Sequence, residues 1–581
     1  MLFREFAEYL EKLEKISSRL EITVVLADLI GKFEVGEAAK GIYLTQGLLG
    51  PIFDNREFSM AAKMVIRSVA LAFGKSTEEV EKEYKRVGDL GEVVVNFGED
   101  KKIQSISLDE VFDDLSEIAY FEGTGSQELK VNKLSKLINK LSFLEGKFVV
   151  RMVMGKLRLG FSEKTVFDAL SQIESGNKSL RKELDRVYQL YPDSGEIVRA
   201  FKEAGLDGLK KIKVKVGVPI VPALCQRLNT YEEIVKNMGE VAIEPKYDGT
   251  RVQIHFDRNV DHSLQITDDR RMVKSFTRNL EESSAMFPEL KKMAEYTNAD
   301  ELILDCEAVG YDPKTGRILN FQETITRKRK HGVEEAAASV PLRFFVFDVL
   351  YCNGESLLSK NYFERREILK KIILKNDVLV VDEFVKTSDP VELEEIHTRF
   401  LEEGYEGAVM KMWSGEYLPG RQGWNWVKIK EAEGTSGKLA DTFDLVVLGY
   451  YYGRGKRAGF GMGAFLAGLK RGDLWVSIAK IGTGLTDIEF TELRKRLDNL
   501  EVVTKPENCL VEGSLAPDVW VSPKVVVEIA ADEVTKSPSH SGGLALRFPR
   551  LVRFRDDKAS EQATTWEEVL RIAKISGNIM I

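Results

Sequence analysis

The sequence predicts a protein of several domains: a helical first region, a mixed α+β middle region and a β-barrel at the C-terminal end. Its 581 residues are 43% hydrophobic and 30% charged, a composition typical of folded rather than low-complexity chains. At roughly 100 to 200 residues per domain, the length predicts about three or four domains. The spacing of the apolar residues also changes along the chain, once near residue 208 and again near residue 430.

The first region is predicted to be all-helical. From residue 1 to about residue 205, apolar residues recur three and four positions apart, as they do between Phe6 and Leu13. Glycine-containing loops interrupt this pattern at Gly123–Gly125 and at Gly205–Gly208. We interpret the second interruption as a domain boundary, so the first domain is expected to span residues 1–208.

The middle region, residues 209–430, is predicted to be an α+β domain. Short runs of β-branched and aromatic residues, which favour strands, alternate here with helical stretches; they are Val252–His255, Leu302–Leu304 and Phe344–Phe347. A polar, glycine-containing stretch at Glu431–Gly437 then has the composition of a linker. Beyond it, in residues 431–581, candidate strands at 445–449, 474–478 and 525–529 are separated by glycine-rich turns, which fits a small β-barrel.

Charge and cysteine content limit the classes of partner and site. The 84 Lys and Arg against 92 Asp and Glu give a net charge of −8, so any surface that binds nucleic acid must be a local basic patch. The four cysteines form no CxxC pair, which argues against a zinc site and a disulfide framework. No apolar run approaches the roughly 20 residues that span a bilayer. We therefore expect a soluble cytoplasmic protein with no membrane association.

The segment with the most chemical information is Glu244–Arg251, which contains Lys246 in a KxDG pattern. Alone, this pattern is weak, because three fixed letters occur by chance in roughly one chain in ten of this length, and a solvated lysine in a turn would explain it. Five further segments follow it in order: Phe276–Asn279, Leu304–Glu307, Phe345–Asp348, Glu406–Lys411 and Trp426–Lys430.

These six segments resemble motifs I, Ia, III, IIIa, IV and V of the covalent nucleotidyltransferase superfamily, in the family order; chance agreement of the whole set is below about one in a hundred. Leu546–Lys558 resembles motif VI, and Arg151–Gly160 resembles a signature of a helical DNA-binding domain. Together they narrow the resemblance to ATP-dependent DNA ligases of the archaeal and eukaryotic replicative type. This implies a helical DNA-binding domain, a nucleotidyltransferase (adenylation) domain and an OB-fold domain.

The resemblance implies that Lys246 is the catalytic nucleophile. It would attack the α-phosphate of ATP to form lysyl-AMP, the AMP would pass to the 5′-phosphate of a nick in duplex DNA, and the 3′-hydroxyl would then displace it. A lysine attacks phosphorus only as the neutral amine, so burial or nearby cations must lower the pKa of Lys246. Lys428 and Lys430 are candidates for those cations.

The resemblance also implies nucleotide and metal contacts. The expected nucleotide-binding residues are Glu244, Arg251, Arg278, Glu307, Phe347, Lys428 and Lys430, with Phe347 stacking on adenine and Glu244 selecting the base. Glu307 and Glu406 would hold Mg²⁺, for which Mn²⁺ can substitute. Many archaeal relatives have an arginine six residues before Lys428, where this chain has Gln422. Either the neighbouring Arg421 takes the contact or the contact is absent.

For DNA, the resemblance implies contacts from Arg151, Lys156 and Arg158, and from Phe321 beside the nick. The basic run that includes Arg327 and Arg329 is equally a phosphate contact or a solvated surface. In motif VI, the residues expected to orient pyrophosphate are Arg547, Arg555, Asp557 and Lys558. The linker at Gly434–Gly437 would be the hinge of the C-terminal domain.

Three other classes of protein share part of this pattern. An RNA ligase or mRNA-capping guanylyltransferase shares the lysine, but the long helical region and Arg547–Arg550 weigh against it. An inert nick-binding protein would not need Lys246, Glu307, Glu406 and Lys428 together. An NAD-dependent ligase would carry a four-cysteine zinc module. We thus expect a monomeric ATP-dependent DNA ligase for replication, repair and recombination, located with the nucleoid. ADP and GTP are additional candidate donors, and Gln104–Leu108 matches a sliding-clamp-binding segment only weakly.

Overall fold

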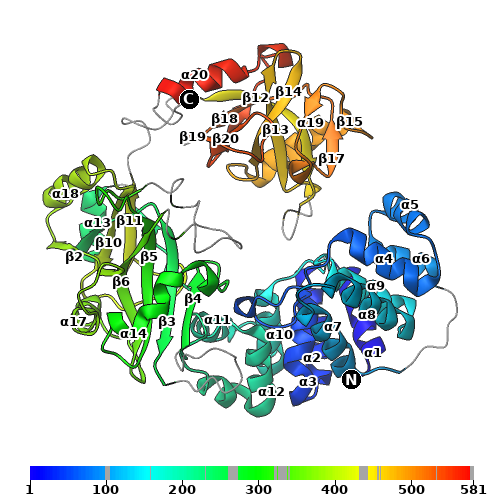
Figure 1. The fold of residues 1–581 in the computed structure, drawn as a ribbon, viewed down its shortest axis with the longest axis horizontal. Helices are drawn as coiled ribbons and strands as arrows, with labels where there is room; N and C mark the ends of the chain where they lie inside the picture. Colours follow the sequence, from blue (N-terminus) through cyan, green and yellow to red (C-terminus); the bar gives the residue numbers. More distant parts are fainter. Residues whose placement is uncertain are drawn as a thin grey trace. The chain divides into compact units, whose positions relative to one another are not determined.

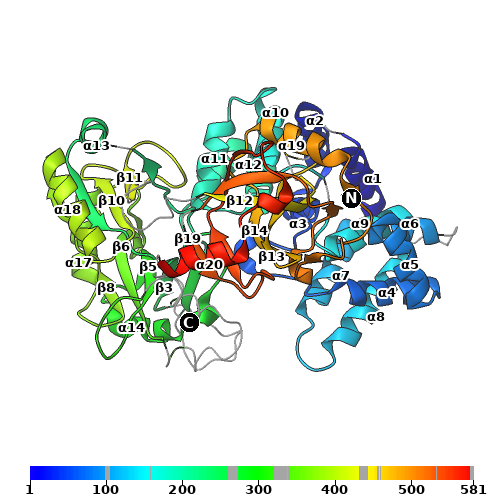
Figure 2. The ribbon, with the colours of Figure 1, turned by 90° about the horizontal axis from the view of Figure 1, so that it is seen from above.

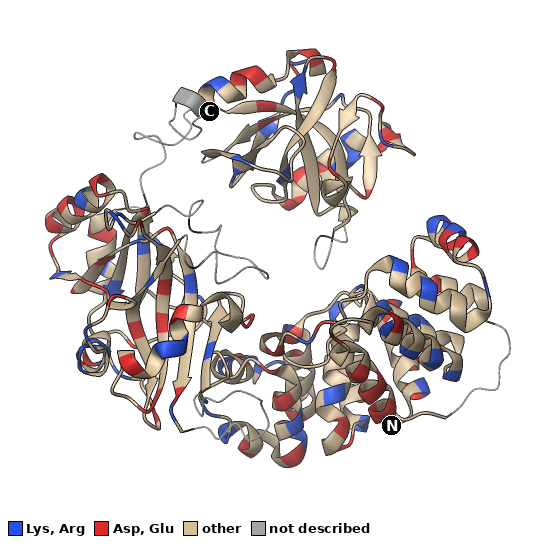
Figure 3. Cartoon of the chain, viewed as in Figure 1, with Lys and Arg blue, Asp and Glu red and all other residues tan. Residues whose placement is uncertain are grey.

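The computed structural model describes residues 1–16, 18–98, 105–157, 159–228, 230–259, 272–319, 324, 337, 340–430, 442–453, 457, 460–531 and 533–575. Its packing separates two compact units, Met1–Lys430 and Glu431–Ile581. Figures 1 and 2 show the helices of residues 1–210 in blue to teal and the strands of residues 211–430 in green to yellow-green. Positively and negatively charged residues are interspersed along these helices (Figure 3).

The first 210 residues fold as helices around one large apolar core that includes Phe6, Leu26 and Phe148. The helices are α1 (Phe3–Glu14), α2 (Arg19–Lys32), α3 (Val35–Gln46), α4 (Ala62–Phe73), α5 (Thr77–Val87), α6 (Leu90–Phe97), α7 (Leu108–Tyr120), α8 (Ser126–Lys140), α9 (Phe143–Val153), α10 (Glu163–Ser175), α11 (Arg181–Leu190) and α12 (Ser194–Lys210). Local sequence fixes several helix starts. In α9, for example, Ser142 and Glu145 form a reciprocal capping box.

The predicted break at Gly205 is a kink inside α12. Ala204 and Gly205 have non-helical backbone angles, with φ 58° and ψ −141° at Gly205, so α12 consists of two helical segments that meet at a kink. The chain then runs directly onto the strands, and the backbone N–H of Val221 donates to the carbonyl oxygen of Gln189 in α11 (2.9 Å). Residues 1–430 pack as one unit, so the division at residue 208 stays a prediction.

Residues 211–430 contain two β-sheets. One sheet has the order β1 (Gln226–Arg227), β11 (Trp426–Lys430), β10 (Gly407–Met412), β2 (Val241–Pro245) and β9 (Val385–Thr387). The other has the order β4 (Met272–Thr277), β3 (Thr250–Asp257), β5 (Glu301–Gly310), β6 (Leu342–Cys352) and β7 (Glu355–Ser356), with β8 (Leu379–Val381) beside β6. The helices are α13 (Tyr231–Met238), α14 (Met293–Tyr296), α17 (Tyr362–Ile372) and α18 (Pro390–Glu402). The three strands predicted here lie within β3, β5 and β6.

The second unit is rich in strands, as the sequence predicted. Its main sheet contains β12 (Phe443–Tyr451), β13 (Ala464–Arg471), β14 (Leu474–Ile481), β15 (Glu501–Val502), β16 (Cys509–Leu510), β17 (Val519–Val521), β18 (Val526–Ala530) and β21 (Arg550–Phe554). A separate pair is formed by β19 (Glu533–Lys536) and β20 (Leu544–Arg547), and the helices are α19 (Asp487–Asp498) and α20 (Trp566–Ile575). Within the described residues, no helix has the length and apolar character needed to cross a membrane.

Candidate active site

A cavity of about 420 Å³ opens in the first unit, where residues of both sheets of the 211–430 region line it. The sequence placed the candidate nucleotide and metal residues in separate segments of the chain. The structure brings nine of them to the wall of this one cavity: Glu244, Lys246, Arg251, Arg278, Glu307, Phe347, Glu406, Arg421 and Lys428.

Lys246 directly follows β2 and continues its pairing with β10. Its backbone N–H donates to the carbonyl oxygen of Gly407, and its own carbonyl oxygen accepts from the N–H of Glu406, both at 2.9 Å. Its ammonium forms an ion pair with the Glu406 carboxylate. The backbone of the candidate nucleophile Lys246 is therefore fixed by strand pairing, and its side chain is paired with that of Glu406.

Burial lowers the pKa of Lys246, and the nearby guanidinium of Arg278 lowers it further, while the carboxylate of Glu307 opposes the shift. The sequence predicts Lys428 and Lys430 as the cations that lower this pKa. Lys428 does line the cavity, and its own pKa is lowered, first by burial and then by Lys246 among its cationic neighbours. The side chain of Lys430 lies outside the described residues.

Gly249 of the KxDG segment lies where any larger residue would clash with β5. A Cβ atom at this position would lie 2.5 Å from the carbonyl oxygen of Ala308 and 3.0 Å from Cγ of Glu307. Real Cβ atoms do not approach a backbone oxygen so closely, so the glycine lets the turn after Lys246 lie against β5.

The strand register places three cavity residues in one row. Val409 of β10 pairs with Glu244 of β2 on one side and with Lys428 of β11 on the other. Residues that pair across neighbouring strands point to the same face of a sheet. This register explains why Glu244 and Lys428 face the same cavity from strands far apart in the sequence.

In the second sheet, Arg251 of β3 pairs directly with Glu307 of β5. Burial raises the pKa of Glu307 to about 7, although Lys246 and Arg251 oppose the shift. The Arg251 guanidinium donates to both carboxylate oxygens of Asp305, at 2.9 and 2.6 Å, and to the carbonyl oxygen of Ala223 at 2.6 Å. Arg251 thus lines the cavity as the partner of a buried aspartate, which the sequence analysis did not foresee.

Phe347 reaches the cavity from a β-bulge. Asp305 pairs with Asp348, and the next residue of β5, Cys306, pairs with Val346, so Phe347 is the extra residue of β6. A bulge turns a side chain out of the regular alternation of its strand. The ring of Phe347 lies edge-on to Trp426, with ring centres 5.8 Å apart, and both rings line the cavity.

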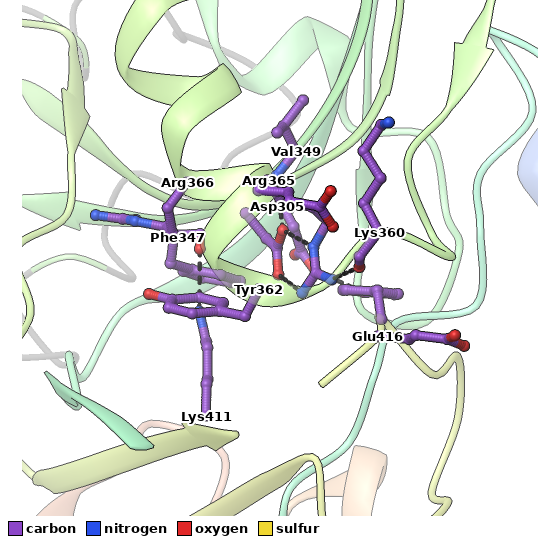
Figure 4. Close-up of polar contacts among 12 residues, drawn as sticks. Asp305, Phe347, Val349, Lys360, Tyr362, Arg365, Arg366, Lys411 and Glu416 are labelled. Atoms are coloured by element: carbon purple, nitrogen blue, oxygen red, sulfur yellow. Dashed lines mark hydrogen bonds and ion pairs between the residues drawn. The ribbon is translucent and has the colours of Figure 1, made fainter. Parts of the chain in front are cut away.

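Two residues that the sequence analysis did not assign to the site contact Glu244. The hydroxyl of Tyr362 donates to Oε1 of Glu244, and Nζ of Lys411 lies 2.6 Å from Oε2. Lys411 also donates to the carbonyl oxygen of Phe347 at 3.0 Å (Figure 4). A signal for Lys411 was available, because it ends the segment that begins with Glu406, but Tyr362 belongs to no quoted motif.

In the loop before β11, the side chains of Arg421 and Gln422 have different surroundings. Arg421 lines the cavity. Gln422 instead donates from Nε2 to Oε1 of Gln189 in α11 at 2.7 Å and to the carbonyl oxygen of Pro419 at 2.7 Å. The structure therefore supports Arg421, rather than Gln422, as the residue available to a ligand in the cavity.

The predicted DNA contact of Arg151 needs correction. The Arg151 side chain is 4% exposed, and its guanidinium forms ion pairs with Asp89, Glu14 and Glu92. Since these carboxylates from α1 and from the start of α6 hold it inside the helical core, Arg151 serves packing and not phosphate binding. Lys156, after the end of α9, is exposed. The other candidates lie outside the described residues: Arg158, Phe321, Arg327 and Arg329.

The motif VI residues of the second unit are arranged around Asp444 on β12. Arg555 lies 2.8 Å and Lys558 2.5 Å from its carboxylate oxygens, and Asp557 pairs with Arg555 at 2.7 Å. The guanidinium of Arg547 lies over the ring of Phe548, 5.3 Å from its centre. The expected hinge at Gly434–Gly437 lies outside the described residues.

The cavity suits a nucleotide and a hard divalent cation. Lys246, Arg278 and Lys428 supply positive charge for phosphates, and Phe347 supplies an aromatic face. Glu307 carries the raised pKa expected of a buried carboxylate that lacks sufficient counter-charge, and Glu406 lies in the same cavity. The described residues contain no group of three or more His, Cys, Asp or Glu that could hold a metal ion.

Comparisons with known proteins agree along the chain. Family models match at residues 222–430 (ATP dependent DNA ligase domain), 2–171 (DNA ligase N terminus) and 458–558 (ATP dependent DNA ligase C terminal region). The chain is 43% identical to a probable DNA ligase of Dictyoglomus turgidum and 36% identical to a DNA ligase of Saccharolobus islandicus, in both cases over 98% of this chain and 97% of the relative. A solved structure named Pmar-Lig_Pre, 17% identical, matches 95% of this chain and 99% of that one with a TM-score of 0.52, a likeness of fold.

Proposed function

The chain belongs to the ATP-dependent DNA ligase family, and on that premise we propose how its residues seal a nick in duplex DNA. The proposal rests above all on one observation: Lys246 has a pKa lowered by burial and opens into a cavity that also holds cations, carboxylates and an aromatic face. A lysine in this setting can supply the neutral amine that attacks a phosphate.

In the first step, Nζ of Lys246 forms a bond to the α-phosphorus of ATP. The bond from this phosphorus to the bridging oxygen breaks, pyrophosphate leaves, and the nitrogen loses a proton. Arg278 and Lys428 face the phosphates and stabilise the charge that develops on them. Phe347 stacks on the base, Glu244 contacts its edge, and Arg421 adds a further cation.

The family uses a divalent metal, and we propose Mg²⁺, which Mn²⁺ can replace, held by Glu307 and Glu406. A bound divalent cation supplies positive charge to the phosphate oxygens. The Glu406 carboxylate also forms an ion pair with the ammonium of Lys246. We therefore assign Glu406 a second duty, which is to hold the lysine protonated until a cation competes for the carboxylate.

The remaining steps use the nick. AMP passes from Lys246 to the 5′-phosphate, and the 3′-hydroxyl then displaces AMP to close the strand; both are phosphoryl-type transfers that depend on positioning and charge.

We propose that residues 1–208 form the DNA-binding domain, 209–430 the adenylation domain and 431–581 an OB-fold domain. Its motif VI residues Arg547, Arg555, Asp557 and Lys558 orient pyrophosphate. We further propose a monomer that works at the nucleoid and is recruited by a sliding clamp.

The test is intact-mass measurement. Protein stripped of bound AMP is incubated with Mg²⁺ and ATP and then given nicked duplex DNA. We expect the gain of one AMP, discharged by the nick, and no gain for Lys246→Ala. The matched control Lys236→Ala, at an exposed position of α13, keeps the adduct. No adduct on the wild-type protein, or an adduct on Lys246→Ala, would overturn the proposal.

A further inference from the structure

A buried cluster behind the cavity wall fixes the orientation of Glu244. The residue is 2% exposed, and each of its carboxylate oxygens has a partner. Oε1 accepts from the hydroxyl of Tyr362, and Oε2 lies 2.6 Å from Nζ of Lys411. A carboxylate held from both sides keeps one orientation and presents its remaining lone pairs in one direction.

Lys411 connects this carboxylate to the stacking residue. Its ammonium donates to the backbone carbonyl oxygen of Phe347 at 3.0 Å, and it lies 4.5 Å from the centre of the Phe347 ring and 4.4 Å from that of Trp426. The side chain of Lys411 is 1% exposed. One buried ammonium therefore positions both Glu244 and the bulged Phe347.

Tyr362 is fixed in turn by the start of α17. Asn361 caps this helix by accepting from the N–H of Glu364, at 2.9 Å. One turn later, Arg365 and Asp348 form an ion pair in which both side chains are fully buried, and Arg365 also donates to the carbonyl oxygen of Lys360 (Figure 4). The hydroxyl of Tyr362 is thus aimed at Glu244 by rigid neighbours.

We propose that Tyr362 and Lys411 are positioning residues that set the base selectivity of the nucleotide donor, by holding Glu244 as a carboxylate that only accepts hydrogen bonds. The inference rests on the proposed function, in which Glu244 contacts the edge of the base. Adenine presents an amino group at position 6, which donates, whereas guanine and hypoxanthine present an oxo group, which accepts. An ionised, oriented carboxylate accepts from the amino group and repels the oxo group.

The protonation of the cluster supports this assignment. Burial, and then the charge of Glu244, raise the pKa of the Tyr362 hydroxyl well above its usual range, so it stays protonated and donates. The ammonium of Lys411 is likewise a donor only. With donors on both sides, both carboxylate oxygens of Glu244 act as acceptors, and a 6-oxo base finds no hydrogen-bond donor there.

The test compares ATP with ITP, in which an oxo group replaces the amino group at position 6. The kcat/KM of self-nucleotidylation is measured with each donor by intact mass, for wild type, Tyr362→Phe and Lys411→Met. The matched control is Tyr231→Phe, which removes a hydroxyl that contacts Nδ1 of His397 at 2.8 Å, away from the cavity wall. Thermal unfolding of each variant checks that it is folded.

We expect wild type and Tyr231→Phe to prefer ATP, and both cluster variants to lower the ATP:ITP ratio by roughly tenfold, the effect of losing one hydrogen bond to a charged group. A general structural loss would lower both rates together and leave the ratio unchanged, which would overturn the inference, as would a wild-type ratio near one. Tyr362→Phe, which removes a single oxygen, decides the matter if Lys411→Met does not fold. A wild-type protein that forms no adduct with ATP would instead contradict the proposed function.

Discussion

Lys246 and Glu406 are joined twice. The backbone N–H of Glu406 donates to the carbonyl oxygen of Lys246 at 2.9 Å, and the two side chains form an ion pair at the cavity wall. The same strand pairing that fixes the backbone of Lys246 therefore also places the carboxylate that forms an ion pair with its ammonium. The backbones of the two residues cannot separate without disrupting the end of β2 and the start of β10.

Replacing Glu406 by Gln should shift the pH dependence of adenylation. A neighbouring carboxylate favours the ammonium, so its removal lowers the pKa of Lys246 still further and moves the rise in rate to lower pH. The maximal rate should fall, because a proposed metal ligand is lost. The measurement is the pH–rate profile of lysyl-AMP formation, with Glu402→Gln as an exposed control. An unshifted profile would show that the ion pair does not restrain the amine.

Gly249→Ala should disrupt the turn after Lys246. The added Cβ would lie 2.5 Å from the carbonyl oxygen of Ala308, so the turn must move away from β5. We expect a destabilisation of about 1–3 kcal/mol and a large loss of adenylation. Gly36→Ala is the control, because its Cβ meets nothing within 4 Å in α3, and it should keep or slightly raise stability. Urea unfolding and adduct formation check both; wild-type behaviour of Gly249→Ala would contradict the packing argument.

Arg421→Ala and Gln422→Ala should differ in their use of ATP. Because Arg421 lines the cavity, its loss should raise the ATP concentration for half-maximal adenylation by about fivefold. Gln422 is engaged with Gln189, so its loss should leave that concentration within about twofold. Adenylation rates across a range of ATP concentrations measure both. The opposite order would assign the nucleotide contact to Gln422.

Arg151→Met should lower the stability of the folded protein without removing a contact to DNA phosphate. Removing the guanidinium breaks its buried ion pairs with Asp89 and Glu14, although Glu14 keeps its ion pair with Lys147, and we expect a loss of roughly 3–5 kcal/mol. Lys156→Met changes an exposed position and should leave the free energy of unfolding unchanged. If Lys156 contacts phosphate, the variant should bind DNA more weakly, and the slope of log K against log salt concentration should fall by about one. Urea unfolding and binding titrations in different salt concentrations separate the two effects. Full stability of Arg151→Met combined with weak DNA binding would restore its role as a DNA contact.

His255 should make the protein less stable as the pH falls. It is fully buried, its Nδ1 accepts from the N–H of Gly217 at 3.0 Å, and burial lowers its pKa from 6.5 to about 3. Between these two values the unfolded chain binds the proton more tightly, so stability decreases from the unfolded pKa downward, by about 2 kcal/mol at about pH 5. His255→Gln should lose this part of the pH dependence. Equal pH dependence of unfolding in both proteins would show that His255 does not contribute.

The sequence predicts those parts of the site that lie in short, continuous segments. Lys246, Glu307, Phe347, Glu406 and Lys428 were found this way, and the structure gathers them at one cavity. The strand predictions in β3, β5 and β6 succeeded for a related reason, since runs of β-branched and aromatic residues report local preference directly.

The remainder depends on packing between distant segments. Tyr362 reaches Glu244 only because α17 lies against β6, and no local pattern reports that contact. Arg151 was assigned to DNA from a basic signature, yet it lies three residues after Phe148, on the buried face of α9. The local sequence does not show that an arginine is buried, because the carboxylates that pair with it come from distant segments of the chain.

The bulge at Phe347 constrains how this site can change during evolution. A substitution at that position alters the ring but not its direction, because the direction is set by the extra residue that β6 carries between the pairs Asp305–Asp348 and Cys306–Val346. Deleting a single residue there would restore regular alternation and turn the following side chains to the opposite face of the sheet. The direction of the Phe347 ring is therefore inherited through strand length, and insertions and deletions alter it more than point mutations do.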